Sequence, residues 1–374
     1  MATQTASFAP GIPLASTSSW KSRALALVLL LSIGVYFWAG SRYPALYKKY
    51  SQGVGVKVTG SLTFGTAYAV DRSMPLPQRV GRTTVNWLQA NEIGMTFGFF
   101  FGAAALTLLT LLPRWRTQNR HLNALIGAAT GAPLGVCANC VVPIARGLYA
   151  SGMSAESVLA AMFSSPSLNV IVLAMAFALF PLPVFALKMA TVLLLIFIVA
   201  PLIGSMAGAR QPGADAIGST LSIPASETWG QALRSTATSF AKSFWYVFKV
   251  GAPLMLLAAL LGALVVELLP QNALATMAAA HVTIPGIVLV ALIGAFLPVP
   301  MAFDVVISYI AMRNGVPLPY VVTILCTLGI YSVYSFSVLG KTISWNAAAT
   351  AYGAVGLLGA CAGIAARLLT GAGS

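Results

Sequence analysis

The sequence predicts an all-α fold: a polytopic transmembrane helical protein with about 8 to 10 membrane segments, arranged as two internal repeats that contain broken helices. Composition is the first reason, because 58% of the 374 residues are apolar, only 7% are charged, and the mean hydropathy is +0.87. Soluble globular domains are much more polar. The second reason is a set of apolar runs close to the roughly 20 residues that a spanning helix needs. They cover residues 24–40, 93–112, 183–206, 244–269 and 346–369.

The N-terminal part predicts a tail followed by a membrane span. Residues 1–20 are rich in Ser, Thr, Pro and Ala, which is typical of a disordered segment. The first apolar run follows Lys21 and Arg23, as the apolar part of a secretory signal would. No small-x-small cleavage site follows before Arg42, so we expect residues 21–41 to form a retained first transmembrane span.

Polar and basic residues gather between the apolar runs. Residues 42–90 are expected to form an extramembrane connection, in which the alternation at 54–58 and 61–69 predicts short strands or an amphipathic cap. The formal net charge of +14 would suggest a nucleic-acid partner in a soluble protein, but here Lys and Arg lie mostly in loops and at span ends. The expected partners are therefore the lipid bilayer and a small-molecule or ion solute. No nucleic acid and no cofactor are expected, and homo-oligomerisation is left open.

The third reason for the predicted fold is internal similarity. A shift of 163 residues, without a gap, superposes Gly131, Ala132 and Leu134 on Gly294, Ala295 and Leu297. It predicts a first transmembrane repeat at 91–206, a polar linker at 207–243 and a second repeat at 244–369. The competing explanation is chance, because small and aliphatic residues coincide easily in membrane sequences.

Each predicted repeat contains two interruptions rich in Gly, Pro and polar residues. They fall at 131–143 and 164–169 in the first repeat, and at 298–304 and 327–332 in the second. Broken helices leave backbone groups unpaired, which a membrane tolerates only inside protein or beside a wet cavity. Matching interruptions in two halves therefore predict a solute site near the midplane. The repeats would be parallel if all four segments cross the membrane, and inverted if one broken segment is re-entrant.

A C-x-x-C sequence stands inside the first interruption. Cys137 and Cys140, separated by one helical turn, are able to bind a soft metal or metalloid, form a disulfide, or exchange with an external thiol. Zinc fits poorly because a structural zinc site needs four ligands, and neither a second pair nor a histidine is near. The alternative is that both cysteines are small apolar packing residues. Asn139 and Pro143 complete this group of candidate solute-binding residues.

Two further groups complete the predicted solute site. Pro166 removes a helix hydrogen bond and frees carbonyl groups near Ser164 and Ser165, while Asn169 offers a donor and an acceptor. A proline kink satisfied by the serine hydroxyls is the alternative. In the second repeat, Pro298 and Pro300 precede Asp304.

Asp304 is the one acidic residue among these candidates. An ionisable side chain with apolar neighbours is a candidate for proton coupling or cation contact. Lys188 is one candidate partner, unless it snorkels to the interface. If the break places Asp304 near the interface, it has no such role.

The stretch at 131–169, with its cysteines, Pro143 and the Ser-Pro-x-x-Asn turn ending at Asn169, resembles the predicted permeases of the YraQ and ArsP type. The resemblance implies a bacterial inner-membrane permease; the best understood members of that family export trivalent organoarsenicals. The family pattern has C-S-C-G before the proline. Here Cys137 matches the first cysteine, Asn139 stands at the second, and Cys140 replaces the glycine. The thiol geometry of the family therefore does not transfer directly.

These observations predict a secondary transporter, not an enzyme, in the bacterial cytoplasmic membrane. Its solute would be small, and a thiophilic metalloid or metal species if the thiols of Cys137 and Cys140 bind it. The alternative function is a membrane thiol–disulfide electron carrier that uses the same two cysteines. Against that alternative, the second repeat has Pro300 and Phe303 at the positions where the cysteines would recur.

Overall fold

The computed structural model describes residues 20–44, 67–71, 73–112, 118–206, 228–268, 273–279 and 281–369, and this part of the chain is almost entirely helical. The tail up to residue 19, the stretch at 54–58, most of 61–69 and the linker up to residue 227 lie outside the described residues.

Five helices are long and apolar enough to cross a membrane, and they contain the five apolar runs of the sequence to within two residues at the run ends. A sixth span results if α6 and α7, which meet at an angle of 49°, are counted as one broken crossing. The chain is therefore a multi-pass helical protein, while the larger total of 8 to 10 segments stays a prediction. The long helices are α1 (Trp20–Phe37) with a π-helical end η1 (Trp38–Arg42), α3 (Leu76–Thr110), the continuous α8 (Leu182–Leu194), η3 (Leu195–Val199) and α9 (Ala200–Met206), α10 (Trp229–Leu268) and α16 (Trp345–Leu369).

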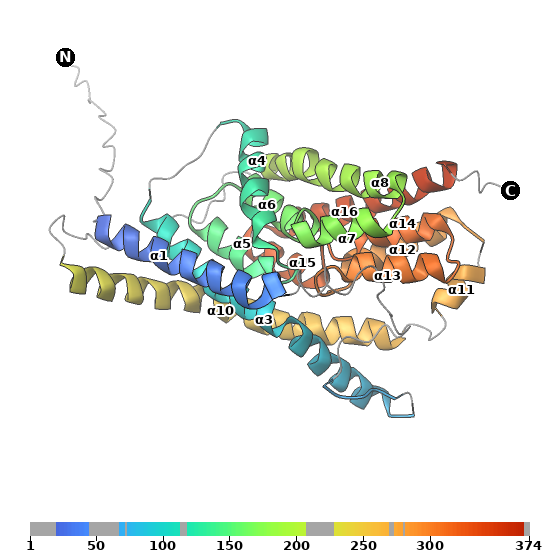
Figure 1. The fold of residues 1–374 in the computed structure, drawn as a ribbon, viewed down its shortest axis with the longest axis horizontal. Coiled ribbons are helices and arrows are strands. Elements are labelled where there is room, and N and C mark those ends of the chain that lie inside the picture. The colour runs from blue at the N-terminus through green and yellow to red at the C-terminus, as the bar shows by residue number, and fades with distance from the viewer. Residues whose placement is uncertain are drawn as a thin grey trace, which may run out of the picture.

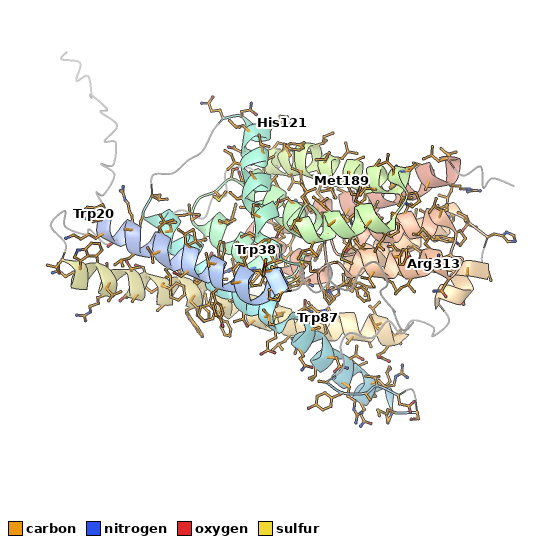
Figure 2. The ribbon with its side chains drawn as sticks, in the orientation of Figure 1. Trp20, Trp38, Trp87, His121, Met189 and Arg313 are labelled. Carbon is orange, nitrogen blue, oxygen red and sulfur yellow. A yellow bond between two sulfur atoms is a disulfide. The ribbon has the colours of Figure 1, made fainter. Side chains whose placement is uncertain are left out.

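Tryptophans mark the two ends of the first helix. Figure 2 shows Trp20 and Trp38 at opposite ends of the α1–η1 segment. Trp20 is 66% exposed and meets Trp229, the first residue of α10, edge to face at 5.3 Å between ring centroids. Tryptophan prefers the boundary between hydrocarbon and water, so this arrangement is typical of a helix that spans a bilayer.

Shorter helices occupy the rest of each half, and they end where the sequence predicts interruptions. The irregular segments at the four predicted interruptions are 132–140, 168–169, 297–302 and 328–332. The short helices are α4 (Arg120–Gly131) with the 3-10 turn η2 (Ala132–Leu134), α5 (Val141–Ala150), α6 (Ala155–Ser167), α7 (Val170–Leu179), α11 (Ala273–Ala279), α12 (Ile284–Phe296), α13 (Phe303–Arg313), α14 (Leu318–Thr327) and α15 (Val333–Thr342).

The helices α3 and α10 run antiparallel and give the molecule its long axis (Figure 1). At one end of this pair, the Thr107 hydroxyl donates a hydrogen bond of 3.2 Å to Ser243. At the other end, the Thr83 hydroxyl donates one of 2.7 Å to Glu267, which also pairs with Arg79 at 2.8 Å. These two ends are called the Ser243 end and the Glu267 end below.

The first half contains a helical hairpin whose tip is buried. α4 lies parallel to α6, because Gly127 packs on Ser157 and Gly131 on Ser164. α5 returns in the opposite direction along α3, where Gly147 contacts Gly102, and so runs toward the Ser243 end. We call α4 and α5 hairpin 1, and residues 132–140 tip 1.

The second half contains a hairpin that points the other way. α12 lies parallel to α14, with Gly286 on Tyr320 and Gly294 on Thr327. α13 returns toward the Glu267 end, because Ile307 shares a cavity with Val266 of α10. We call α12 and α13 hairpin 2, and residues 297–302 tip 2. Figure 1 shows α12–α14 toward the end of the long axis where α11 lies, and α4–α6 nearer its middle, with α15 between the two groups.

Part of the expected extramembrane connection at 42–90 is helical, because α3 begins at Leu76. Pro75 precedes the helix and Pro77 occupies its second position, where proline is well tolerated. Val80, Thr83 and Trp87 then follow at helical spacing and are buried. The polar residues between them concealed this buried face. Likewise, α10 begins at Trp229, inside the expected linker.

The contact between α3 and hairpin 1 depends on glycine. A Cβ atom at Gly102 would lie 2.8 Å from the carbonyl oxygen of Pro143 and 3.0 Å from Cα of Ile144. We expect Gly102→Ala to lower the free energy of unfolding in detergent by about 1–3 kcal/mol, because backbone atoms of α5 would have to move. Gly353→Ala in α16 is the matched control, since nothing lies within 4 Å of its Cβ position. Equal stability of the two variants would contradict the close contact.

Candidate functional site

Tip 1 turns at Gly135, which has a left-handed φ of 58° that side chains rarely permit. The first span contacts this turn, because the Trp38 indole N–H donates a hydrogen bond of 3.1 Å to the carbonyl of Pro133. On the other side, the Ser165 hydroxyl lies 3.4 Å from both the N–H and the carbonyl oxygen of Val136. Tip 1 is therefore held by elements on two sides.

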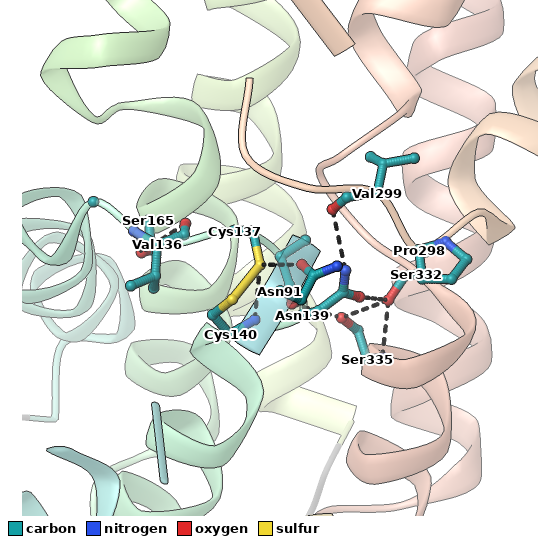
Figure 3. Close-up of a disulfide and its surroundings, with 12 residues drawn as sticks. Asn91, Val136, Cys137, Asn139, Cys140, Ser165, Pro298, Val299, Ser332 and Ser335 are labelled. Atoms are coloured by element: carbon teal, nitrogen blue, oxygen red, sulfur yellow. Dashed lines mark hydrogen bonds between the residues drawn. A yellow bond between two sulfur atoms is a disulfide. The ribbon is translucent and has the colours of Figure 1, made fainter. Parts of the chain in front are cut away.

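Asn139 joins the two halves at the centre of the molecule (Figure 3). Its side-chain N–H donates a hydrogen bond of 3.1 Å to the carbonyl of Val299 in tip 2, and its oxygen accepts one of 2.8 Å from the Ser332 hydroxyl. Ser335 adds a hydrogen bond of 3.1 Å to the carbonyl of Ala138. Asn139 is completely buried. One amide thus satisfies polar groups of both second-half interruptions.

Cys137 and Cys140 form a disulfide beside this amide. Both are buried, with 2% of each residue exposed, and the Sγ atom of Cys137 lies 3.7 Å from Oδ1 of Asn91 on α3. The two cysteines lie in the turn just before α5, which begins at Val141, and the Val141 N–H donates a hydrogen bond of 3.1 Å to the carbonyl of Cys137. One turn of helical type therefore separates them. Pro143 keeps the regular helix from extending further back, because its ring would then clash with the carbonyl of Asn139.

The polar residues of the second interruption satisfy one another. The Asn169 oxygen accepts from the N–H of Val172 at 3.0 Å and so caps α7. Its amide N–H groups donate to the carbonyls of Ser165 and Pro166, at 2.9 and 3.0 Å. Ser164 packs against Gly131 and donates to the carbonyl of Ala161 at 3.3 Å. The kink is therefore satisfied mainly by Asn169, and Ser165 is the member that reaches tip 1.

Tip 2 presents backbone carbonyl groups as hydrogen-bond acceptors, and its two prolines have no N–H to donate. Pro298 accepts a hydrogen bond of 2.7 Å from the Trp87 indole, and Pro300 accepts one of 3.3 Å from the N–H of Phe303. Asn91 in turn donates to the carbonyl of Trp87 at 2.9 Å. One face of α3 therefore contacts both the disulfide and tip 2. Pro143 lies away from this junction, packed on Gly98 and Gly102.

Asp304 is buried and paired with Lys188. The ammonium group lies 2.6 Å from the carboxylate and donates a second hydrogen bond of 2.9 Å to the carbonyl of Leu325. The side chains are 1% and 8% exposed, so Lys188 does not snorkel to an interface. A Cβ at Gly329 would lie 3.5 Å from both Asp304 and Val299, which places the pair next to tip 2.

Two buried charges escaped the sequence analysis. Arg146, 7% exposed, donates to the carbonyl of Tyr246 at 3.3 Å and to the Thr342 hydroxyl at 3.2 Å. Glu156, 5% exposed, accepts a hydrogen bond of 2.8 Å from Asn123. Both are charged residues within apolar stretches. This is the criterion that identified Asp304, so the same criterion would have found both.

An apolar cavity of about 160 Å³ lies between α3, α10 and hairpin 2. In the second half, the cavity lies between the returning hairpin helix α13 and the long helix α10. In the first half, the returning helix α5 packs directly on the long helix α3. Residues from both tip 2 and the long helices line the cavity, among them Trp87, Gly262, Ala263, Pro298, Val299 and Ile307.

A family model described as "Predicted permease", of the ArsP type, matches residues 93–368. The chain belongs to this predicted permease family. The match extends from the middle of α3 to the end of α16, so it contains both hairpins, both tips and the Lys188–Asp304 pair, and it leaves out α1. The resemblance expected from the sequence is confirmed. Comparisons with curated proteins and with solved structures gave no match. The permease is thus an integral, multi-pass membrane protein.

The Asn139 bridge predicts a measurable loss of stability. Asn139→Ala would leave the buried Val299 carbonyl without its partner, at a cost of about 1–3 kcal/mol, and would remove one hydrogen bond of the Ser332 hydroxyl, which keeps its contacts with Ser335. We expect the free energy of unfolding in detergent to fall accordingly. Asn314→Ala is the control, because that exposed amide only donates to the carbonyl of Ile310 and should matter by less than about 0.5 kcal/mol. A difference near zero between the two variants would refute the bridge.

The four cysteines predict a labelling pattern. Cys361 is exposed, Cys326 is buried, and the other two are bonded to each other. Cys361 lies on the outer surface of the membrane helix α16, so the folded protein, purified without reductant, should take up one membrane-permeant maleimide, at Cys361, as measured by intact mass and peptide mapping. Unfolding without reduction should add Cys326 alone. Labelling of Cys137 or Cys140 before reduction would contradict the disulfide.

Proposed function

We propose that this permease is a secondary transporter of the bacterial inner membrane, in which a small solute crosses where tip 1 meets tip 2. The observation that carries the proposal is the Asn139 bridge, because it brings the interruptions of the two halves together at one buried point. Helix breaks that meet in this way form the solute sites of many secondary transporters. Rocking of one half against the other would expose the junction to each side in turn.

A duplication supports this mechanism. At the offset of 163 residues, Val170–Leu179 falls on Val333–Thr342, and Leu182–Met206 falls on Trp345–Leu369. The close contact of Gly131 with Ser164 falls on that of Gly294 with Thr327. The α7 cap Asn169 likewise falls on the α15 cap Ser332. Chance similarity of aliphatic residues would not align helix bounds, caps and packing contacts together.

The directions of the hairpins support inverted repeats. Hairpin 1 returns toward the Ser243 end and hairpin 2 toward the Glu267 end, so neither needs to cross the membrane. Each half then crosses with its first long helix, its broken helix pair and its last long helix. An odd number of crossings places the second half upside down relative to the first, which is the arrangement of many alternating-access transporters.

The position of the cysteines supports a soft solute. In the reduced form, Cys137 and Cys140 would present two thiols at the junction, with a Cα separation of 5.1 Å. Thiolates prefer soft species such as Cu(I) or trivalent metalloids. Within the described residues, no group of three or more His, Cys, Asp and Glu side chains comes together.

The disulfide itself favours a second function, a thiol–disulfide electron carrier. Its burial weighs against this function, because a partner thiol must reach one sulfur atom and each cysteine is only 2% exposed. The two functions differ in what they require. A carrier depends on the cysteines alone, whereas a transporter also depends on the polar groups around the tips.

The first test is growth of a sensitised bacterial strain on arsenite, methylarsenite, antimonite and Cu(I). We expect the wild type to confer resistance to at least one compound, and Cys137→Ser with Cys140→Ser to abolish it, because hydroxyl groups bind soft species poorly. Asn169→Ala should also reduce resistance, because it removes the cap of α7 at the kink. Cys361→Ser, at an exposed thiol, is the matched control and should be silent.

No resistance to any compound above empty vector would refute soft-solute export. If Asn169→Ala is silent while the cysteine variant is inactive, the carrier function is favoured. In that case a mixed disulfide should be trapped through Cys137 or Cys140 when the other cysteine is replaced by serine.

A further inference from the structure

We propose that the Lys188–Asp304 pair is the proton-binding site that couples transport to a pH gradient. This inference rests on the proposed transporter and names its energy source. The pair connects the two halves, because Lys188 belongs to α8 of the first half, while Asp304 and the Leu325 carbonyl belong to α13 and α14 of the second. Any rocking of one half against the other acts on this connection.

The pair is not needed to pack the fold. At the offset of 163 residues, Asp304 falls on Val141 and Lys188 falls on Ala351. Both of these residues are completely buried, so the first half uses apolar side chains where the second half uses a charged pair. Apolar replacements of buried ion pairs are often neutral or stabilising. A desolvated pair that occurs in one half alone therefore points to a function other than stability.

The position next to tip 2 connects the charge to the solute junction. Asp304 is in the first turn of α13, directly after tip 2, and Val299 of that tip accepts the hydrogen bond from Asn139. Gly329 belongs to the second interruption of the second half, at 328–332. A Cβ atom at this position would lie 3.5 Å from both Asp304 and Val299. A movement of tip 2 that opens the junction would therefore also move the carboxylate.

Protonation changes this connection without any other reagent. One proton from the aqueous phase converts the Asp304 carboxylate to a neutral acid, and the ionic bond to Lys188 is lost. Lys188 then donates only to neutral oxygen atoms, those of the acid and of the Leu325 carbonyl, so the connection between the two halves is weakened there. Release of the same proton on the opposite side restores the ion pair. One proton is bound and one released in each cycle, and no bond other than O–H changes.

The titratable groups around the pair come from several elements. Cys326 of α14, which is buried, interacts electrostatically with both charges. Among the described residues, the other titratable groups on the elements that contain the pair or pack against them are Glu156 on α6, Tyr309 and Arg313 on α13, Tyr320 on α14, Tyr331 between α14 and α15, and Tyr352, Cys361 and Arg367 on α16. The ion-pair partner of Asp304 is Lys188.

The test uses the full chain in proteoliposomes, with methylarsenite as the first probe, followed by arsenite, antimonite and Cu(I). Two modes are measured: accumulation driven by a pH gradient, and exchange of internal for external solute without a gradient. The main variant is Lys188→Ala with Asp304→Val, which copies the residues at 351 and 141. We expect it to lose driven accumulation and to keep exchange. Loss of both modes in a folded variant, or loss of neither, would overturn the inference.

Two further measurements cover a variant that does not fold. Asp304→Glu keeps the charge and should shift the pH dependence of driven accumulation while leaving exchange intact; an unchanged pH profile would count against the inference. In the wild type, an entrapped pH dye should report proton movement with each solute. Solute transport without proton movement would overturn the coupling and leave the proposed transporter standing. If none of the four compounds is transported in either mode, both the proton coupling and the proposed transporter are overturned.

Discussion

The backbone groups left unpaired at each broken helix in this permease must find hydrogen-bond partners within the protein, since hydrocarbon offers none. Side chains from distant elements supply these partners. Asn139 serves tip 2 and the start of α15, Trp87 serves Pro298, and Lys188 serves the carbonyl at the end of α14. These three side chains come from the first half of the chain, and the groups that they satisfy belong to the second. The interruptions that weaken individual helices are therefore the points at which the halves hold each other.

Close helix packing makes these long-range bonds possible. Gly98, Gly102 and Gly147 let α5 lie against α3, and Gly131 and Gly294 let each hairpin contact the next broken helix. In lipid, helices gain little from burying apolar surface against each other, so small residues that allow close contact contribute more than large ones. Glycine at these positions sets where the tips sit, and the tips set where Asn139 can reach.

Much of this architecture could be predicted from local sequence signals. The apolar runs identified the long helices, and the Gly- and Pro-rich segments identified the interruptions to within a few residues. Lys188 was recognised as a candidate partner of Asp304 because few charges occur in apolar stretches. The start of α3 was missed, because its buried face is partly polar and alternates with exposed Arg and Gln. Charge, hydropathy and proline positions are properties of short segments, so they can be taken directly from the sequence.

The contacts across the halves could not be read in the same way. Ser332 and Ser335 appear ordinary in the sequence, and only the fold brings them to Asn139 and Ala138. The direction of the hairpins depended on which helices lie parallel, which no single segment encodes. Pro143 and Ser164 are predicted at the solute site, and the structure places them in contact with glycines of α3 and α4. Proline and serine in a membrane break have the same appearance whether they face a solute or a neighbouring helix.

The cavity beside tip 2 makes the two hairpins mechanically unequal. Hairpin 1 packs on α3 through glycine contacts that hold backbone against backbone, and the first span donates a hydrogen bond to its tip through Trp38. Hairpin 2 instead borders a partly open apolar cavity of about 160 Å³ on its α10 side. Close-packed backbone cannot shift without a clash, whereas side chains beside a cavity have space to repack. On the side that faces the long helices, hairpin 2 is therefore the hairpin with space to move.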